Sequence, residues 1–408
     1  MPWQIFHWGA FHWSAFHWGA VNWIAGSLLA LAWFSRLVDA AIGMPRIADI
    51  ARPEWDRSPA TPTGEPRVSI IVPARNEEED IRETLVRLLA LDYSNYEVIA
   101  VNDRSTDRTG AIIDDVAASS EAHGLLKAIH IPDLPSGWLG KTHAMWTSAQ
   151  QATGAWLLFT DADVQFKPDA LRRAVAYAET ERADHVVLFP RMIMKRPSER
   201  MMIAFFQALF VFGHRPWKVA DPRARDHMGV GAFNMVRRSV YDAVGTYRAL
   251  RMEVLDDMKL GKVIKNAGFA QRNVFGEDLI SLYWARGAFG MVNNLTKNFF
   301  AVLSFQWPRT VATIVGLGFL NLGPFLGVWL AHGWARLPYA IALVSLFGIY
   351  YGMSGMSAVP AYYFFLHPVS TSLFMYTLLR SMIQTLANGG VVWRGTKYPL
   401  EELRKGMV

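Results

Sequence analysis

Two aspartates two positions apart follow an apolar run and could together hold a divalent metal ion. Asp161 and Asp163 come directly after residues 156–160, WLLFT, a run that indicates a buried β-strand. Because alternate residues of an extended chain point to the same side, both carboxylates can reach one point. Mg²⁺ or Mn²⁺ needs such a pair from a protein when a diphosphate and water supply its other ligands. The alternative is an Asp-rich turn in which Asp163 caps the following segment.

Further polar groups follow two other apolar runs. The segment 73–78, PARNEE, follows a strand predicted at 68–72, and Asp103 follows a strand predicted at 97–102. Ligands of parallel α/β sheets bind beyond the carboxyl ends of the strands, so we expect these groups near Asp161. Beside a metal site there, Asp103 would lie where a nucleotide base or ribose binds. An Asx-turn is its structural alternative.

A lysine and a pair of acids complete the candidate site. Lys141 follows the glycine-hinged loop 135–140 and begins a predicted helix, where it could meet a diphosphate at the helix N-terminus. An exposed loop lysine is the alternative. Asp256 and Asp257 stand at the start of a helical segment, where carboxylates also stabilise the N-terminus. Adjacent side chains project in different directions, so one cap does not account for both acids.

The elements that must position these residues alternate along the middle of the chain. Between residues 66 and 287 the pattern predicts strands at 68–72, 97–102, 125–131, 156–160 and 185–189, and helices at 78–91, 108–119, 141–151 and 168–179. Strands that alternate with helices indicate an α/β fold with a mostly parallel sheet covered on both faces.

Apolar residues crowd into both ends of the chain, which indicates membrane segments around a soluble core. Hydrophobic residues make up 52% of the sequence and charged residues 19%. The first 43 residues hold no Lys, Arg, Asp or Glu before Arg36, and the next basic residues, Arg46, Arg52 and Arg57, follow the apolar run. By the positive-inside rule, this anchor leaves the following domain in the cytosol. Ahead of it, the near-repeat FHWGA indicates an interfacial tryptophan belt; His7, His12 and His17 recur every five residues, so they share no helix face for a metal.

The C-terminal apolar region leaves its number of crossings open. It has three stretches, at residues 310–331, 337–352 and 358–386, and is preceded by an amphipathic segment, 291–308, that carries Lys297 and is typical of an interfacial helix. Three crossings would place the tail outside, whereas its basic residues favour the cytosol. One stretch is then re-entrant, or the third forms a hairpin.

The bulk charge and the absence of cysteine exclude several kinds of site. The formal net charge is +6 and the chain has no cysteine, which excludes disulfides, thiolate metal sites and cysteine nucleophiles. The basic residues are not interleaved with aromatic ones as in single-strand binders. We therefore expect membrane and nucleotide partners and no nucleic acid.

Taken in order, the motifs PARNEE, VNDRSTD, GWLGKTHA, FTDADV, LDDMKLG and YWARG resemble those of the family 2 glycosyltransferases of the GT-A fold. They are most similar to the membrane-bound branch that contains ceramide glucosyltransferase-like, hopanoid-associated and carotenoid glycosyltransferases. The resemblance covers residues 68–287. It implies a Rossmann-like catalytic domain, a nucleotide-sugar donor such as a UDP-hexose, and a lipid acceptor.

The resemblance also implies roles for individual residues. Pro73, Arg75 and Glu77 would line the nucleotide base pocket, and Asp103 would contact the base or ribose. Lys141 would approach the diphosphate, with the metal at Asp161 and Asp163. Asp257 matches the second acid of the family's Glu-Asp pair and is the expected catalytic base, while Asp256 stands where the family usually has Glu and is the second candidate.

One departure from the family pattern bears on the product. Processive members carry Gln-x-x-Arg-Trp before a similar Ala-Arg-Gly, whereas this chain has ISLYW at residues 280–284 and keeps only Trp284. This favours transfer of one sugar over polymerisation. Trp284 would be an acceptor platform or an interfacial tryptophan. The rival functions are a processive polysaccharide synthase and a non-catalytic membrane scaffold that binds nucleotides.

The expected organisation has six parts. An aromatic-rich segment and transmembrane anchor (1–43) and a linker (44–65) precede the GT-A domain (66–290); the interfacial helix (291–308), the C-terminal transmembrane region (309–388) and a cytosolic tail (389–408) follow. The hypothesis is an inverting glycosyltransferase that moves one sugar to a lipid.

Overall fold

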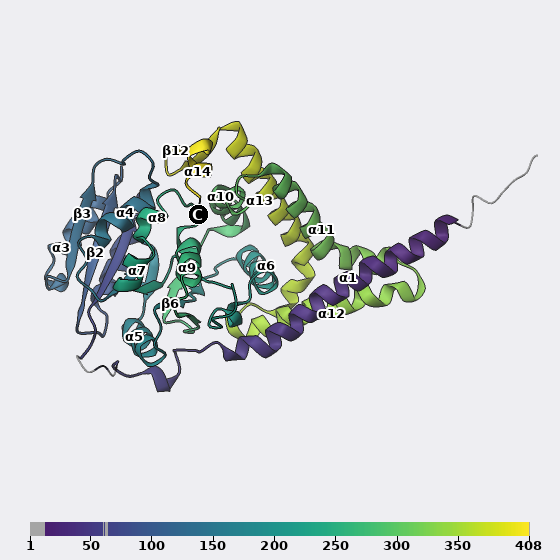
Figure 1. Cartoon of the computed structure of the whole chain (residues 1–408), viewed down its shortest axis with the longest axis horizontal. Helices are drawn as coiled ribbons and strands as arrows, with labels where there is room; N and C mark the ends of the chain where they lie inside the picture. Colours follow the sequence, from purple (N-terminus) through teal and green to yellow (C-terminus); the bar gives the residue numbers. More distant parts are fainter. Residues whose placement is uncertain (1–12, 60, 62–63, 408) are drawn as a thin grey trace, which may run out of the picture. The chain divides into compact units, whose positions relative to one another are not determined.

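The chain folds into two compact units. The computed structural model describes residues 13–59, 61 and 64–407 (Figure 1). The α/β unit comprises Gly43–Glu199, His214–Thr310 and Thr377–Val408, and the helical unit comprises the chain up to Ile42 together with Arg200–Gly213 and Val311–Tyr376. The aromatic near-repeat falls largely before Trp13, so His7 and His12 lie outside the described residues.

A seven-stranded sheet forms the centre of the α/β unit. Its order is β3-β2-β1-β4-β8-β6-β9, with β1 (Val68–Ala74), β2 (Tyr96–Asp103), β3 (Leu126–Ile131), β4 (Trp156–Phe159), β6 (His185–Leu188), β8 (Asn234–Arg237) and β9 (Gln271–Val274). Only β8 runs antiparallel to its neighbours among these strands. The order reverses between β1 and β4, and ligands of such sheets bind at the reversal.

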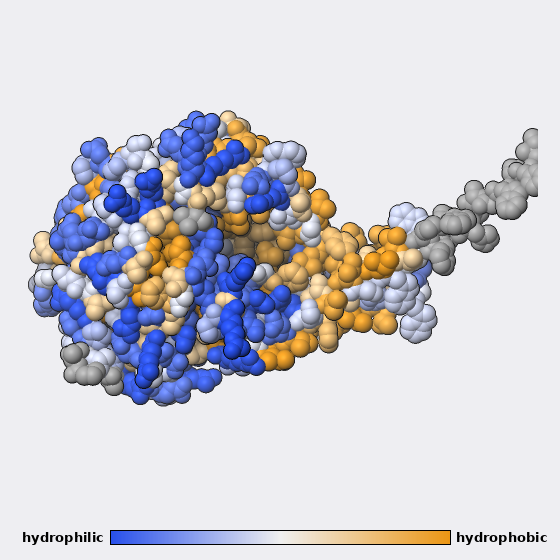
Figure 2. All heavy atoms as spheres, viewed as in Figure 1, coloured by the Kyte–Doolittle hydropathy of each residue, from blue (hydrophilic) through white to orange (hydrophobic). Residues whose placement is uncertain are grey.

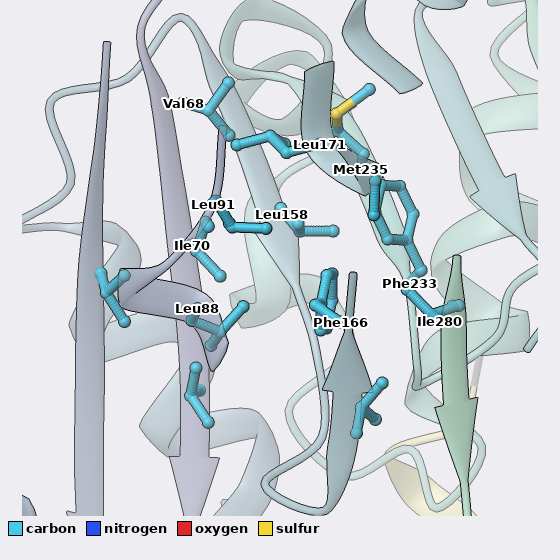
Figure 3. Packing of buried hydrophobic residues seen from close by; sticks show 14 of the residues in the cluster. Val68, Ile70, Leu88, Leu91, Leu158, Phe166, Leu171, Phe233, Met235 and Ile280 are labelled. Carbon is cyan, nitrogen blue, oxygen red and sulfur yellow. The ribbon is translucent and has the colours of Figure 1, made fainter. Parts of the chain in front are cut away.

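Helices cover both faces of this sheet, as the sequence predicts. One core cluster takes α2 (Ile81–Leu89), α3 (Thr109–Ala117) and α5 (Ala170–Thr180), and the opposite cluster takes α4 (Gly140–Ala149), α7 (Arg238–Ala243), α8 (Thr246–Ala249) and α9 (Asp256–Asn266). Successive residues of β1 alternate between the clusters, with Ile70 in the first and Ile71 in the second, because strand side chains alternate between the faces. Figure 3 shows Ile70 and Leu158 packed with Leu88 and Leu91 in the first cluster.

Two smaller sheets accompany the seven-stranded sheet. A three-stranded sheet, β5-β10-β7, consists of β5 (Val164–Phe166), β7 (Arg191–Met192) and β10 (Ile280–Leu282). The hairpin of β11 (Gly390–Trp393) and β12 (Thr396–Pro399) leads into α14 (Leu400–Lys405). This C-terminal segment packs against α10 (Gly287–Val302) in a cluster that includes Leu139, Met252, Phe300, Val391 and Tyr398. The hydrophobic effect therefore holds the end of the chain against the loops that precede Lys141 and Asp256.

The helical unit is built mainly from α1 (Trp13–Gly43), α6 (Pro197–Gly213), α11 (Trp307–Leu330), α12 (Arg336–Ser357) and α13 (His367–Ala387). Within the described chain, three helical segments are long and apolar enough to cross a membrane: Trp18–Arg46, Trp307–Leu330 and Gly333–Ser357. Hydrophobic surface gathers over these helices in Figure 2. The third apolar stretch is divided between a 3₁₀ helix, Ala361–Leu366, and α13, and it is not among these candidate spans.

Other short 3₁₀ helices occupy Met44–Arg46, Pro53–Trp55, Ser120–Ala122, Pro216–Lys218 and Gly333–Ala335. The predicted strands and helices of the first half are confirmed with small shifts of their ends. Helix α6 and strands β8 and β9 were not predicted from the sequence. Helix α6 is apolar because it packs among the other helices of its unit: the Phe212 ring lies 4.8 Å from Trp33 and the Phe205 ring 5.4 Å from Phe374.

Candidate active site

Four of the predicted charged groups meet at one small cavity beyond the end of β4. Lys141 Nζ lies 2.8 Å from Asp161 Oδ1 and 3.5 Å from Asp256 Oδ2. Asp257 lines the same cavity, together with Met145, Phe159, Thr160, Gly231, Asn234 and Tyr247. Asp161 follows β4, whereas Asp256 and Asp257 begin α9, far away in the sequence. Their convergence gives one concave site in which three carboxylates surround a single ammonium group.

The loop before β8 holds two of the acids in place. The Asp161 amide donates to the Gly231 carbonyl at 3.0 Å, and the Gly231 amide donates to Asp257 Oδ2 at 2.8 Å. Asp257 Oδ1 accepts the Met258 amide at 2.7 Å. A Cβ on residue 231 would stand 2.5 Å from Asp161 Oδ2, inside van der Waals contact. Glycine at 231 therefore leaves room for the Asp161 carboxylate while its backbone bridges the Asp161 amide and the Asp257 carboxylate.

The charges in the cavity shift one another's pKa values. Burial alone would lower the pKa of Lys141, but attraction to Asp161, Asp256 and Asp257 raises it above its usual value. Burial, reinforced by repulsion from Asp257 and Asp161, raises the pKa of Asp256 to about 7 despite the nearby Lys141. Burial likewise raises the pKa of Asp257. A carboxylate with a raised pKa is suited to proton transfer near neutral pH.

Asp161 and Asp163 are the carboxylates predicted to hold a divalent cation. Asp163 is not among the residues that line the cavity, and burial, with repulsion from Asp161 and Glu77, raises its pKa to about 7. The donor set is all oxygen, as Mg²⁺ and Mn²⁺ prefer. Within the described residues, no group of three or more His, Cys, Asp or Glu side chains is placed to hold a metal. The two aspartates would therefore be the protein's contribution, with other ligands from a bound diphosphate and water.

The residues predicted for the nucleotide lie in the last residues of β1 and β2 or just after β1, next to the strand-order reversal. Asp103 is buried and pairs with Arg104 through contacts of 2.7 and 3.0 Å, while Arg75 Nη1 lies 4.0 Å from Asp103 Oδ2. Glu77 forms an ion pair with Arg394. Pro73 is half-buried in β1. The two loops are tied together where the Thr106 amide donates to Asn76 Oδ1 at 2.8 Å, which fixes one rim.

Two basic residues that were not predicted for the site, Lys297 and Arg394, act electrostatically on Asp161. Arg394 stands in the turn between β11 and β12, and Lys297 Nζ lies 4.6 Å from the ring centroid of Trp393 in the same hairpin. Burial, with repulsion from Arg394 and Lys141, lowers the pKa of Lys297 to about 8. The Tyr398 hydroxyl accepts the Gly140 amide at 3.1 Å. The segment VVWRGTKY could have indicated a hairpin, since Arg394 and Gly395 separate two short runs that contain β-branched and aromatic residues.

Trp284 occupies a different position from the charged cluster. It follows β10, is half-buried, and packs against the main core cluster of the α/β unit. Its backbone carbonyl accepts a hydrogen bond of 3.0 Å from Asn294 Nδ2 on α10. Trp284 is not among the residues that line the cavity.

The sequence of residues 69–258 matches the Glycosyl transferase family 2. This chain contains a family 2 glycosyltransferase domain. The matched residues include β1, β4 and the start of α9, which carry Glu77, Asp161 and Asp257 to the site's rim and cavity. The family thus covers the elements that hold the acids, whereas Lys297 and Arg394 lie outside the matched segment.

Known proteins similar to this glycosyltransferase agree with that assignment. A 4,4'-diaponeurosporenoate glycosyltransferase from Staphylococcus aureus is 22% identical over 348 residues, which cover 82% of this chain and 89% of that protein. The Staphylococcus haemolyticus protein of the same name is 22% identical over 251 residues, covering 61% and 65% of the two chains. A mannosyltransferase from Pyrobaculum calidifontis, solved with GDP-Man and Mn²⁺, has a TM-score of 0.52 at 20% identity and covers 90% of this chain and 99% of its own. The last similarity supports the GT-A fold.

Proposed function

We propose that this glycosyltransferase is membrane-anchored and moves one sugar, with inversion, from a nucleotide-sugar donor to a lipid acceptor. The observation that carries the proposal is the convergence of Lys141, Asp161, Asp256 and Asp257 on one cavity. Asp161, the proposed metal ligand, and Asp257, the proposed base, both line this cavity. In a single displacement, the diphosphate leaves the anomeric carbon while the acceptor oxygen attacks the same carbon. The group that binds the metal and the base must therefore lie close together.

The donor is proposed to be a UDP-hexose, with its diphosphate near Asp161 and Asp163. A bound Mg²⁺ or Mn²⁺ would neutralise the leaving diphosphate as a Lewis acid. Lys141, Lys297 and Arg394 would add positive charge around the phosphates. Asp103 with Arg75 would meet the base or ribose. The mannosyltransferase of similar fold was solved with GDP-Man and Mn²⁺, so a guanine nucleotide donor belongs in the same test.

The proposed chemical step uses Asp257 as the base. The acceptor oxygen forms a bond to the anomeric carbon while the bond to the diphosphate breaks, and the hydroxyl proton passes to an Asp257 oxygen. Backbone amides of Gly231 and Met258 hold that carboxylate at 2.8 and 2.7 Å. A positioned base is worth on the order of 10²–10⁴ in rate. Lys141 bridges Asp161 and Asp256 and fixes their separation before the donor binds.

The proposed location places the catalytic unit at the cytosolic face of a membrane. Residues 377–408 belong to the same compact unit as the catalytic domain, so an even number of crossings separates them. Candidate spans Trp307–Leu330 and Gly333–Ser357 supply two. The basic residues after α1 and in the tail then lie on one side, which the positive-inside rule assigns to the cytosol. A lipid acceptor could reach the site without leaving the bilayer.

The test is transfer of label into lipid. Membranes containing the protein are incubated with labelled UDP-glucose, other UDP-hexoses or GDP-mannose in Mn²⁺, and lipid extracts are separated for labelled products. We expect one donor to label one lipid class with a single sugar. A ladder of longer products would contradict single transfer, and water-soluble labelled products alone would contradict a lipid acceptor. Labelling only of lipid carboxylates, which arrive deprotonated, would contradict the need for a base.

A further inference from the structure

Asn234 presents an unused hydrogen-bond donor to the catalytic cavity. It begins β8 opposite Phe159 of β4, is 1% exposed and lines the cavity. Its neighbours Phe233 and Met235 belong to the first core cluster (Figure 3), so strand alternation turns Asn234 to the other face. Among the described residues, Asn234 Nδ2 is buried without a hydrogen-bond partner. Such atoms are rare in proteins and call for a specific explanation.

A chain of buried side chains fixes which end of the Asn234 amide faces the cavity. The Met228 amide donates to Gln271 Oε1 at 2.8 Å, so Gln271 Nε2 is the donor toward Gly261 O at 3.1 Å and toward His185 Nδ1 at 2.7 Å. His185 Nδ1 is therefore an acceptor, which leaves the proton of the neutral imidazole on Nε2. That N–H donates to Asn234 Oδ1. The Asn234 NH₂ group must then point away from His185.

The surroundings keep this orientation fixed. His185 and Gln271 are 0% and 1% exposed, and burial lowers the pKa of His185 to about 4, so the imidazole is neutral at ordinary pH. Two backbone groups, Met228 N and Gly261 O, anchor the far end. The protein thus holds the amide in one of its two orientations, because a flip would set two N–H groups against each other.

Several of the protein's own acceptors in the cavity are already engaged. Lys141 contacts Asp161 Oδ1 and Asp256 Oδ2. The two Asp257 oxygens accept backbone amides. The cavity has room for a group about the size of one water molecule. A single hydroxyl of a sugar has that size and supplies the acceptor oxygen that Asn234 Nδ2 lacks.

We propose that Asn234 binds one hydroxyl group of the transferred sugar, and that the Gln271–His185 pair orients its amide for this contact. The inference rests on the proposed function, since it assumes a nucleotide sugar whose hexose reaches the cavity. Asn234 would then be a donor-specificity residue. It would distinguish a hexose that places a hydroxyl at this point from one that does not, because an unmatched buried N–H disfavours the wrong sugar.

The experiment compares sugar-dependent binding in matched variants. Full-length protein in detergent with Mn²⁺ is titrated with UDP-glucose, GDP-mannose, UDP and GDP. The wild type should bind one nucleotide sugar more tightly than its diphosphate. Asn234→Ala and Asn234→Asp should each lose about tenfold affinity for that sugar nucleotide and keep their affinity for the diphosphate. The Asp variant retains an acceptor for His185 and tests the loss of NH₂ at nearly constant shape.

A second set of ligands and a control variant separate contact from folding. The deoxy analogue that lacks the contacted hydroxyl should bind wild type and Asn234→Ala equally. Asn273→Ala removes another buried amide without a partner among the described residues, on β9 and outside the cavity lining, and should change nothing. The inference would be overturned if the Asn234 variants bound the nucleotide sugar as wild type does, or if they lost as much affinity for the diphosphate as for the nucleotide sugar. It would also be overturned if the wild type bound no nucleotide sugar more tightly than its diphosphate. Absence of transfer by wild type would instead contradict the proposed function.

Discussion

Arg394 forms an ion pair with Glu77 although 317 positions separate them in the sequence. Glu77 follows β1 at the edge predicted for the nucleotide, and Arg394 belongs to the hairpin near the C-terminus. The pair is partly shielded from solvent, since the side chain of Glu77 is 19% exposed and that of Arg394 is 37% exposed. The C-terminal hairpin therefore contacts the loop after β1 that is proposed to bind the nucleotide.

Replacing Arg394 should weaken donor binding. Arg394→Gln removes a guanidinium proposed to lie near the diphosphate, and a charge-assisted hydrogen bond of about 1.5–3 kcal/mol corresponds to roughly tenfold or more in affinity for UDP. The measurement is calorimetric titration in Mn²⁺. Arg380→Gln is the matched control, since Arg380 contacts Asn293 on α10 at 2.7 Å and should leave the affinity unchanged. Equal affinities for wild type and Arg394→Gln would contradict this role.

Lys297 should make donor affinity depend on pH. Its pKa is lowered to about 8, so the free protein carries this positive charge below pH 8 and loses it above. Affinity for a diphosphate should therefore fall as pH rises through about 8. Lys297→Arg should remove this fall, because a guanidinium stays protonated, and Lys297→Gln should bind weakly throughout. If the diphosphate affinity of Lys297→Arg fell at alkaline pH as the wild-type affinity does, a group other than Lys297 would cause the fall.

Asp163 should be required for metal-dependent binding. Asp163→Asn removes one of two proposed carboxylate ligands, and we expect the apparent affinity for Mn²⁺ in the presence of UDP to fall by at least about tenfold. Mn²⁺ paramagnetic resonance measures the free ion directly. Glu79→Gln, which removes an exposed carboxylate paired with Arg286, serves as the control. Retained Mn²⁺ affinity in Asp163→Asn would exclude this residue as a ligand.

A methyl group at residue 231 should displace the Asp161 carboxylate. The added Cβ would stand 2.5 Å from Asp161 Oδ2, and the end of a side chain can move away. Gly231→Ala should therefore melt near the wild-type temperature yet lose Mn²⁺-dependent UDP binding. Gly316→Ala introduces its methyl group where no atom lies within 4 Å and should retain binding. Full binding by Gly231→Ala would show that the bridge tolerates a side chain.

Local pattern was enough to predict the acids and the elements that carry them. Asp161 and Asp257 stand at a strand end and a helix start, and both signals lie within a few residues of the acids. The meeting of Lys297, Arg394 and Asn234 with these acids could not be predicted in the same way. It depends on long-range packing of Leu139 and Phe300 against Val391 and on the antiparallel insertion of β8. No local periodicity specifies either contact.

The helical unit illustrates the same limit. The spans at 310–331 and 337–352 follow from hydropathy alone and correspond to α11 and α12. Helix α6 lies inside the segment predicted as one soluble domain, and its apolar surface is used by Trp33 and Phe374, both remote in sequence. Hydropathy detects a helix that is long enough to span, whereas a 17-residue helix among others resembles a buried core helix.

The separation of donor binding from sugar transfer tests the central claim most directly. UDP affinity in Mn²⁺ and transfer rate are measured on the same preparations of wild type, Asp161→Asn and Asp257→Asn. Asp161→Asn should lose Mn²⁺-dependent binding and transfer together. Asp257→Asn should bind UDP as wild type does and transfer about 10²–10⁴ times more slowly. Normal transfer by Asp257→Asn, or unchanged binding and transfer by Asp161→Asn, would contradict a catalytic site assembled from these two carboxylates.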